Sequence, residues 1–202
     1  QVFATHESKD WQGERARLRQ LLTPEEYRSA QATTLNAHYT SPTVVSAMYD
    51  VVQRFGFSHG KVLDPSMGTG HFFGLMPEKM RENSVLTGIE IDPVTAGIAR
   101  LLYPDSRVRQ QGFEHSKLPD GSFDLVISNV PFGNYKVFDP EFNRHNLLIH
   151  DYFFAKALQK VRPGGLVSFI TSMGTMDKQD AGLREYLYQR AEFLGAIRLP
   201  NN

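Results

Sequence analysis

From residue 61 onward, short apolar segments alternate with helix-like segments, and this alternation constrains the fold more than any other feature of the sequence. Strands are expected at residues 61–63, 85–90, 107–110, 123–128, 166–171 and 193–199, helices at 93–103, 150–161 and 181–190, and a turn at 162–165. Apolar strands separated by helices are typical of a mostly parallel sheet with helices on both faces. The sequence therefore predicts an α/β, Rossmann-like fold, in which ligands bind at the carboxyl ends of the strands.

Helices are also expected before the first strand. Thr23 is placed to cap one helix, with Glu26 completing a capping box, and Ser41 is placed to begin another. We therefore expect residues 1–35 to form an N-terminal helical extension and residues 36–202 to form the main domain.

The composition excludes several classes of function. The 22 basic and 22 acidic residues give a formal net charge of zero, whereas a protein that coats nucleic acid by bulk charge is basic. The absence of cysteine excludes disulfides, a cysteine zinc site and a covalent cysteine adduct. The seven histidines show no metal-ligand spacing, so no metal is expected. No apolar run approaches the ~18 residues of a membrane span, and residues 1–6 lack a signal-peptide pattern, so a cytoplasmic protein without membrane contact is expected.

The segment after the first expected strand is rich in glycine. It reads Asp64-Pro65-Ser66-Met67-Gly68-Thr69-Gly70. Its glycines let the backbone pass close to a ligand, and Asp64 places a carboxylate at the tip of the strand. The dinucleotide-binding pattern G-x-G-x-x-G is absent, because its first glycine would stand where Asp64 and Pro65 are. The alternative is a plain strand-to-helix turn.

Two acidic residues follow the second expected strand. Glu90 ends that strand and is placed to accept hydrogen bonds from two ribose hydroxyls. Asp92 stands directly before Pro93 and is expected to cap the next helix. The alternative for Glu90 is the same capping role.

The sharpest signal follows the fourth expected strand, where the chain reads Asn129-Val130-Pro131-Phe132. An amide side chain both accepts and donates hydrogen bonds, and an aromatic ring offers a flat face. Together these groups suit a planar base that carries an exocyclic amine. The alternative is an ordinary strand-end turn with Phe132 in the core.

These segments resemble the amino-group methyltransferases that use S-adenosylmethionine, and most closely the N6-adenine DNA methyltransferases. That family has the pattern D-P-x-x-G-x-G, then an acid at the end of the second strand, then N/D-P-P and an aromatic residue. The chain matches it at residues 64–70, at Glu90 and at residues 129–132. Residues 36–42, which read N-A-H-Y-T-S-P, resemble the Y-T-P-like segment that precedes the glycine-rich loop in one variant of the family. Within the family, the chain looks most like methylase domains of phage- and plasmid-borne proteins, which are often joined to helicase-like regions.

The resemblance implies the fold of S-adenosylmethionine-dependent methyltransferases and S-adenosyl-L-methionine as cofactor. The cofactor-binding residues that it implies are Tyr39, Thr40, Asp64, Pro65, Ser66, Gly68, Gly70, Glu90, Ile91, Phe113 and Glu114, and the catalytic residues are Asn129, Val130, Pro131 and Phe132. Asn129 and the carbonyl of Val130 would bind the amino group of an adenine flipped out of duplex DNA, and Phe132 would stack on its ring. For Phe113, a core aromatic is an equal alternative.

Some features depart from the family's pattern. Val130 stands where the first proline is usual. The family's sheet ends with a seventh strand, and a target-recognition region chooses the DNA sequence; the chain has room for neither. We therefore expect a fold truncated before the seventh strand, with DNA as a partner and with further domains, such as a target-recognition or helicase region, on a longer parent chain. Two alternatives stay open: methyl transfer to RNA or to a protein glutamine, and a non-catalytic module that binds the cofactor or nucleic acid.

Overall fold

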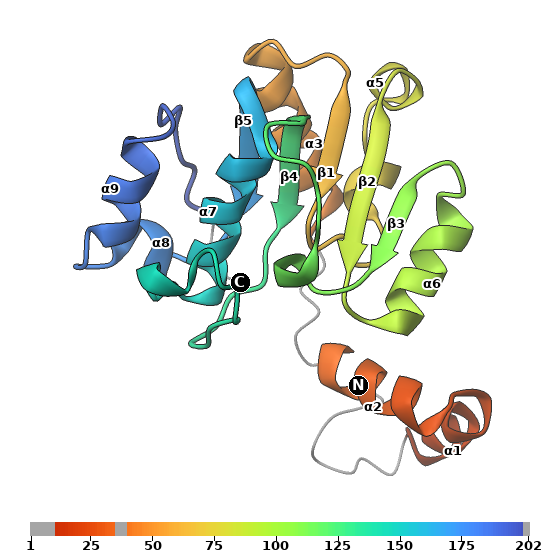
Figure 1. Ribbon diagram of the computed structural model, residues 1–202. Helices are drawn as coiled ribbons and strands as arrows, with labels where there is room; N and C mark the ends of the chain where they lie inside the picture. The colour runs from red at the N-terminus through yellow and green to blue at the C-terminus, as the bar shows by residue number, and fades with distance from the viewer. Residues whose placement is uncertain (1–10, 35–39, 200–202) are drawn as a thin grey trace.

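The computed structural model describes residues 11–34 and 40–199 (Figure 1). Its strands are β1 (Lys61–Asp64), β2 (Val85–Glu90), β3 (Arg107–Gln110), β4 (Phe123–Asn129) and β5 (Val161–Ile170). Its α-helices are α1 (Gln12–Leu21), α2 (Pro24–Thr34), α3 (Pro42–Arg54), α4 (His71–Gly74), α5 (Glu78–Glu82), α6 (Pro93–Leu102), α7 (Ile149–Lys160), α8 (Gly174–Asp177) and α9 (Gly182–Tyr188), and two 3₁₀ turns are η2 (Phe113–His115) and η3 (Asn143–His145). The strands form one parallel sheet in the order β3-β2-β1-β4-β5. The expected α/β, Rossmann-like fold is confirmed.

The two faces of the sheet bury alternate residues of its central strands. Along β1, Val62 belongs to the core cluster under α3, whereas Leu63 belongs to the cluster under α7. The same alternation on β4 places Leu125 in the first cluster and Val126 in the second. Because successive side chains of a strand point to opposite faces, an unbroken apolar strand is buried on both sides. The structure thus has helices on both faces of the sheet, as Figure 1 shows.

The expected helix starts are confirmed by their hydrogen bonds. The backbone N–H of Thr23 donates to Glu26 Oε2 at 2.8 Å, and the N–H of Glu26 donates back to Thr23 Oγ1 at 3.3 Å, which is a capping box. Ser41 Oγ accepts from the N–H of Val44 at the start of α3. At the start of α6, Asp92 accepts from the N–H of Thr95 at 2.8 Å. Local side-chain chemistry therefore sets where these three helices begin.

Two expectations at the carboxyl-terminal end of the sheet are wrong. Residues 193–199 have no regular structure, because no described strand pairs with them and Gly195 interrupts them at φ 151°. The expected turn at residues 162–165 lies inside β5, because Val161 already pairs with Phe123. The next pair, Leu125 with Leu166, comes after a register shift that the four intervening residues of β5 absorb.

The N-terminal helices lie below the carboxyl edge of the sheet, the edge toward which the strand arrows point in Figure 1. Helix α2 packs against α6, and Ser29 Oγ on α2 donates to Asp92 Oδ1 at 2.5 Å. The extension thus contacts the segment that directly follows Glu90. Within the described ranges, no helix is long and apolar enough to cross a membrane.

Candidate active site

Three polar side chains end three neighbouring strands at the carboxyl edge of the sheet. Asp64 ends β1, Glu90 ends β2 and Asn129 ends β4. Strand β1 lies between the other two, and its residues pair in parallel register with both. The structure therefore brings together the three side chains on which the interpretation of the sequence depended.

The carboxylate of Glu90 ties the glycine-rich loop to the start of α6. Its Oε2 accepts from the N–H of Gly68 at 2.9 Å, and its Oε1 accepts from the N–H of Asp92 at 2.8 Å. Burial of this carboxyl raises the pKa of Glu90, and the two backbone N–H groups partly oppose that rise. The sequence predicted a ligand-binding role for Glu90 but gave no sign of its contact with Gly68. A carboxylate has about four acceptor sites, so two such bonds leave capacity for a ligand.

The two glycines of the loop serve different purposes. Both have left-handed backbone conformations, with φ 56° at Gly68 and 91° at Gly70. A Cβ at Gly70 would overlap the ring of Tyr103, whereas a Cβ at Gly68 would meet no described atom. The backbone at Gly68 therefore faces open space beside Glu90, where a ligand can approach closely. Pro65 is buried and Ser66 is half-buried in the same loop.

Asp64 is an acid that is fully buried at the tip of β1. Its Oδ1 accepts from Ser128 Oγ at 2.6 Å and from the N–H of Ser66 at 3.2 Å. Its Oδ2 has no hydrogen-bond partner among the described residues. Burial raises the pKa of Asp64 to about 7, although the hydrogen bonds from Ser128 and Ser66 oppose that rise. A buried acceptor that lacks a donor fits a site that receives a donor from a ligand.

The raised pKa of Asp64 makes a prediction about stability. The folded protein holds this proton more tightly than the unfolded chain does, so the free energy of unfolding of the ligand-free protein should fall as pH rises from about 4 to about 7. Asp64→Asn keeps the oxygen that accepts from Ser128 and cannot titrate. We expect it to lose less stability than the wild type between pH 5 and pH 8, in urea unfolding at both pH values. Glu90, whose pKa is also raised, is common to both proteins. An equal loss in both would show that Asp64 does not titrate in this range.

The segment after β4 is fixed by contacts on both sides. Asn129 Nδ2 donates to Thr40 Oγ1 at 3.1 Å, which joins the end of β4 to the segment before α3. Val130 is buried, and its N–H donates to the carbonyl of Ile170 on β5 at 3.1 Å. A proline at this position would have no N–H to donate, so valine gains a bond to the neighbouring strand. Pro131 and Phe132 are half-buried. Tyr39, the other predicted residue near Thr40, lies outside the described residues.

After β3, Phe113 is buried and Glu114 is more accessible to solvent. Phe113 is 2% exposed, and its ring packs against Phe153 at 5.1 Å between centroids and against Tyr152 at 6.2 Å. The structure thus places the ring of Phe113 in the core, which was one of its two alternatives. Glu114 is partly exposed, and its carboxylate lies against Gly112. Ile91, after β2, is 62% exposed.

A cavity of the described structure lies away from these residues. It has a volume of about 610 Å³ and is lined by Phe57, Pro77 and Met80, which precede β1 and β2. It therefore opens at the amino ends of the strands. Among the described residues, no group of three or more His, Cys, Asp or Glu side chains can hold a metal ion.

Comparison with known proteins identifies the family. The profile of the family described as "Methyltransferase domain" matches residues 63–169, which run from the end of β1 through β2, β3 and β4 to the penultimate residue of β5. The chain belongs to this methyltransferase family. S-adenosylmethionine is therefore its cofactor. The carboxyl edge of the sheet has features that suit it: the open backbone at Gly68, the acceptor capacity of Glu90 and the unsatisfied oxygen of Asp64.

Two curated relatives are similar in sequence to this chain; one is a phage protein and the other is an rRNA methyltransferase. The chain is 32% identical over 173 residues to the "Defense against restriction protein B" of Escherichia phage P1, an alignment that covers 83% of this chain and 8% of that protein. It is 27% identical over 146 residues to the "rRNA N(6)-adenosine-methyltransferase metl-5" of Caenorhabditis elegans, covering 68% of this chain and 64% of that protein. The chain thus spans less than two thirds of either relative.

A solved structure supports the same fold. The methyltransferase subunit of a type I restriction-modification system from Streptococcus thermophilus superposes with a TM-score of 0.63 at 18% identity, over 82% of this chain and 42% of that chain. At this identity the likeness concerns the fold alone. Both proteins therefore share the methyltransferase architecture described above.

Proposed function

We propose that this methyltransferase transfers the methyl group of S-adenosylmethionine to the N6 amino group of adenine in DNA. The observation that carries the proposal is Asn129 at the end of β4, followed by Val130, Pro131 and Phe132, on the strand beside the one that ends in Asp64. The names of two relatives support the proposal, since one names the N6 position of adenosine, in rRNA, and the other names restriction.

The chemistry assigned to the catalytic residues follows from the properties of the amine. The lone pair of adenine N6 is delocalised into the ring, so the amine is a poor nucleophile. Asn129 Oδ1 and the Val130 carbonyl accept hydrogen bonds from its two N–H groups, which favours a pyramidal nitrogen whose lone pair points at the methyl carbon. Thr40 supports this by holding the amide nitrogen of Asn129. Phe132 stacks on the base, a contact worth about 1–3 kcal/mol in other proteins, and Pro131 holds the backbone between them rigid.

S-adenosylmethionine supplies a methyl group that is already activated on a sulfonium. With the cofactor bound, the N6 nitrogen would form a bond to the methyl carbon as the carbon–sulfur bond broke, which would leave S-adenosylhomocysteine and release the surplus N6 proton to solvent. No strong general base is needed, because correct positioning can supply up to about 7–11 kcal/mol of such a barrier. In duplex DNA the adenine must first leave the stack, which costs a few kcal/mol.

The cofactor-binding roles that we propose divide along the strand ends. Gly68 and Gly70 let the backbone approach the donor, with Pro65 and Ser66 shaping the same loop, and Asp64 faces the amino-acid end of the cofactor. Glu90 and Ile91 hold the ribose. Glu114 contacts the adenine and Phe113 supports it from the core. Tyr39 and Thr40 close over the methionine tail.

The contrast between the two glycines predicts two different phenotypes. Gly68→Ala should fold with a loss of only about 1 kcal/mol in the free energy of unfolding, since its Cβ meets no described atom and only the left-handed backbone opposes it. It should nevertheless weaken S-adenosylmethionine binding, because the new methyl group enters the space beside Glu90. Gly70→Ala should lower the melting temperature far more, because its Cβ overlaps Tyr103. Thermal unfolding and calorimetric titration of both variants check this. Equal melting temperatures would contradict the distinction.

The competing acceptors are RNA and protein, and the rRNA adenosine methyltransferase relative favours RNA as the second candidate. The test is transfer of labelled methyl from S-adenosylmethionine to unmethylated DNA, ribosomal RNA and protein in parallel reactions. We expect label in DNA. Label in RNA or protein alone would overturn the DNA assignment and leave the methyltransferase activity in place.

We also propose that residues 1–35 form a helical extension to a catalytic domain of residues 36–202. Supporting this, α2 contacts the main domain through α6 and through the bond from Ser29 to Asp92. A longer parent protein with a target-recognition or helicase region is part of the proposal, because the chain spans 8% of its phage relative.

A further inference from the structure

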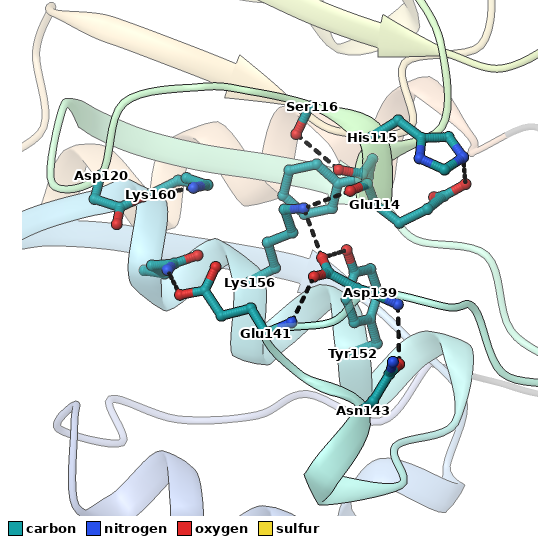
Figure 2. A network of polar contacts seen from close by, with 12 residues as sticks. Glu114, His115, Ser116, Asp120, Asp139, Glu141, Asn143, Tyr152, Lys156 and Lys160 are labelled. Carbon is teal, nitrogen blue, oxygen red and sulfur yellow. Dashed lines mark hydrogen bonds and ion pairs between the residues drawn. The ribbon is translucent and has the colours of Figure 1, made fainter.

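A buried lysine joins the segment after β3 to the segment after β4. Lys156 lies on α7 and is 4% exposed. Its Nζ donates to Asp139 Oδ2 at 2.8 Å and to the backbone carbonyl of Glu114 at 3.2 Å (Figure 2). The same ammonium lies 5.2 Å from the centroid of the Phe113 ring and 5.7 Å from that of Tyr152. One cation therefore contacts two loops that are distant in sequence.

The partner of this lysine is itself held on several sides. Tyr152 donates its hydroxyl proton to Asp139 Oδ2 at 2.7 Å, and the N–H of Glu141 donates to Oδ1 at 3.1 Å. Burial raises the pKa of Asp139, but the hydrogen bonds from Lys156, Tyr152 and the N–H of Glu141, together with the charge of Lys156, outweigh it and hold that pKa below its usual value. Asp139 is therefore ionised at neutral pH, and Lys156 carries the compensating charge.

The turn that Lys156 holds is short and has few contacts of its own. In η2, the carbonyl of Phe113 accepts from both the N–H and the hydroxyl of Ser116, whereas the carbonyl of Glu114 accepts from Lys156. The ring of Phe113 lies under the same ammonium. Lys156 therefore binds the backbone carbonyl of Glu114, while the carboxylate of Glu114 lies 3.6 Å from His115 Nε2.

We propose that Lys156 is a positioning residue that holds the Phe113–Glu114 turn and thereby sets how well the protein binds the adenine of its cofactor. This rests on the proposed contact between Glu114 and that adenine. Lys156 does not touch the cofactor; it acts through the carbonyl of Glu114 and the ring of Phe113. Its bond to Asp139 anchors it to the loop that follows the catalytic segment.

The chain offers a matched control one helical turn away. Lys160 is on the same helix and is 5% exposed, and its Nζ pairs with Asp120 Oδ1 at 2.5 Å. Asp120 lies in the loop before β4, outside η2. Lys160→Met therefore removes a buried lysine of α7 and its ion pair without touching the turn at Glu114.

The experiment measures dissociation constants by calorimetry for S-adenosylhomocysteine and for S-inosylhomocysteine, in which a carbonyl replaces the 6-amino group. We expect the wild type to favour the adenine form by about tenfold, as loss of a hydrogen bond to a charged group implies. Lys156→Met should bind S-adenosylhomocysteine about tenfold more weakly and lose most of that preference. Lys160→Met should keep both properties of the wild type, and Lys156→Arg should restore part of the preference.

A second variant guards against misfolding, because Lys156→Met leaves the Asp139 charge buried and unpaired. The double variant Lys156→Met/Asp139→Asn removes both charges, and its amide can still accept from Glu141 and bond to Tyr152. It should show the same loss of preference. Wild-type preference in either Lys156→Met protein would overturn the inference and leave the cofactor site intact. No preference in the wild type would overturn the assignment of Glu114 in the proposed function, and the inference with it.

Discussion

Asn129→Ala is expected to lower the rate of methyl transfer by about 100-fold or more, as removal of one preorganised polar contact does in other enzymes. The affinity for S-adenosylmethionine should stay close to that of the wild type, because the cofactor residues that we propose lie mainly on β1 and β2. The transfer rate falls because alanine cannot accept a hydrogen bond from the adenine amino group, so the nitrogen lone pair stays delocalised in the ring. Single-turnover methyl transfer measures the rate, and calorimetric titration with S-adenosylmethionine measures the affinity.

The control for this prediction is Asn134→Ala. Asn134 carries the same amide in the same loop, five residues further on, but is exposed to solvent. It should transfer methyl at close to the wild-type rate. Equal rates for wild type and Asn129→Ala would contradict the catalytic role of Asn129, and an equal loss in both variants would indicate a general disturbance of the loop.

Glu90→Gln is expected to raise the dissociation constant for S-adenosylmethionine by about 100-fold, since hydrogen bonds to charged groups are worth about 1.5–3 kcal/mol each. Two effects combine. The amide has one acceptor oxygen where the carboxylate has two, so it cannot accept from both Gly68 and Asp92 and also bind a ribose. The glycine-rich loop thereby loses its anchor to β2.

The measurement is calorimetric titration with S-adenosylhomocysteine and with its 2′-deoxy and 3′-deoxy analogues. The wild type should bind the analogues more weakly than the parent compound, whereas Glu90→Gln should bind all three with similar, low affinity. Glu82→Gln, at the end of α5, is the control because it removes an exposed charge outside the site. A Glu90→Gln protein that still discriminates against the deoxy analogues would contradict the ribose contact.

Elements with strong local signals could be predicted from the sequence. The strands at 85–90 and 107–110 have the predicted bounds, because each apolar or alternating run is closed by a turn or cap. The helix starts at Thr23, Ser41 and Asp92 followed from capping chemistry, which acts within four residues.

The errors concern features that depend on partners distant in sequence. The expected strand at 193–199 needs a neighbour to pair with, and none of the described strands provides one. The true start of β5 depends on the pairing of Val161 with Phe123, which no local pattern shows. The same holds within the site, where the contact from Gly68 to Glu90 and the contacts of Lys156 join segments 22 and 42 residues apart.

Transfer of the methyl group to the amino group of adenine in DNA would be shown by the chemical position of the methyl group in the product. DNA incubated with the protein and labelled S-adenosylmethionine would be digested to nucleosides and separated by mass spectrometry. We expect the label to appear in N6-methyl-2′-deoxyadenosine and to disappear with Asn129→Ala. Label in a methylated cytosine, or no labelled nucleoside from DNA while another acceptor is methylated, would contradict it.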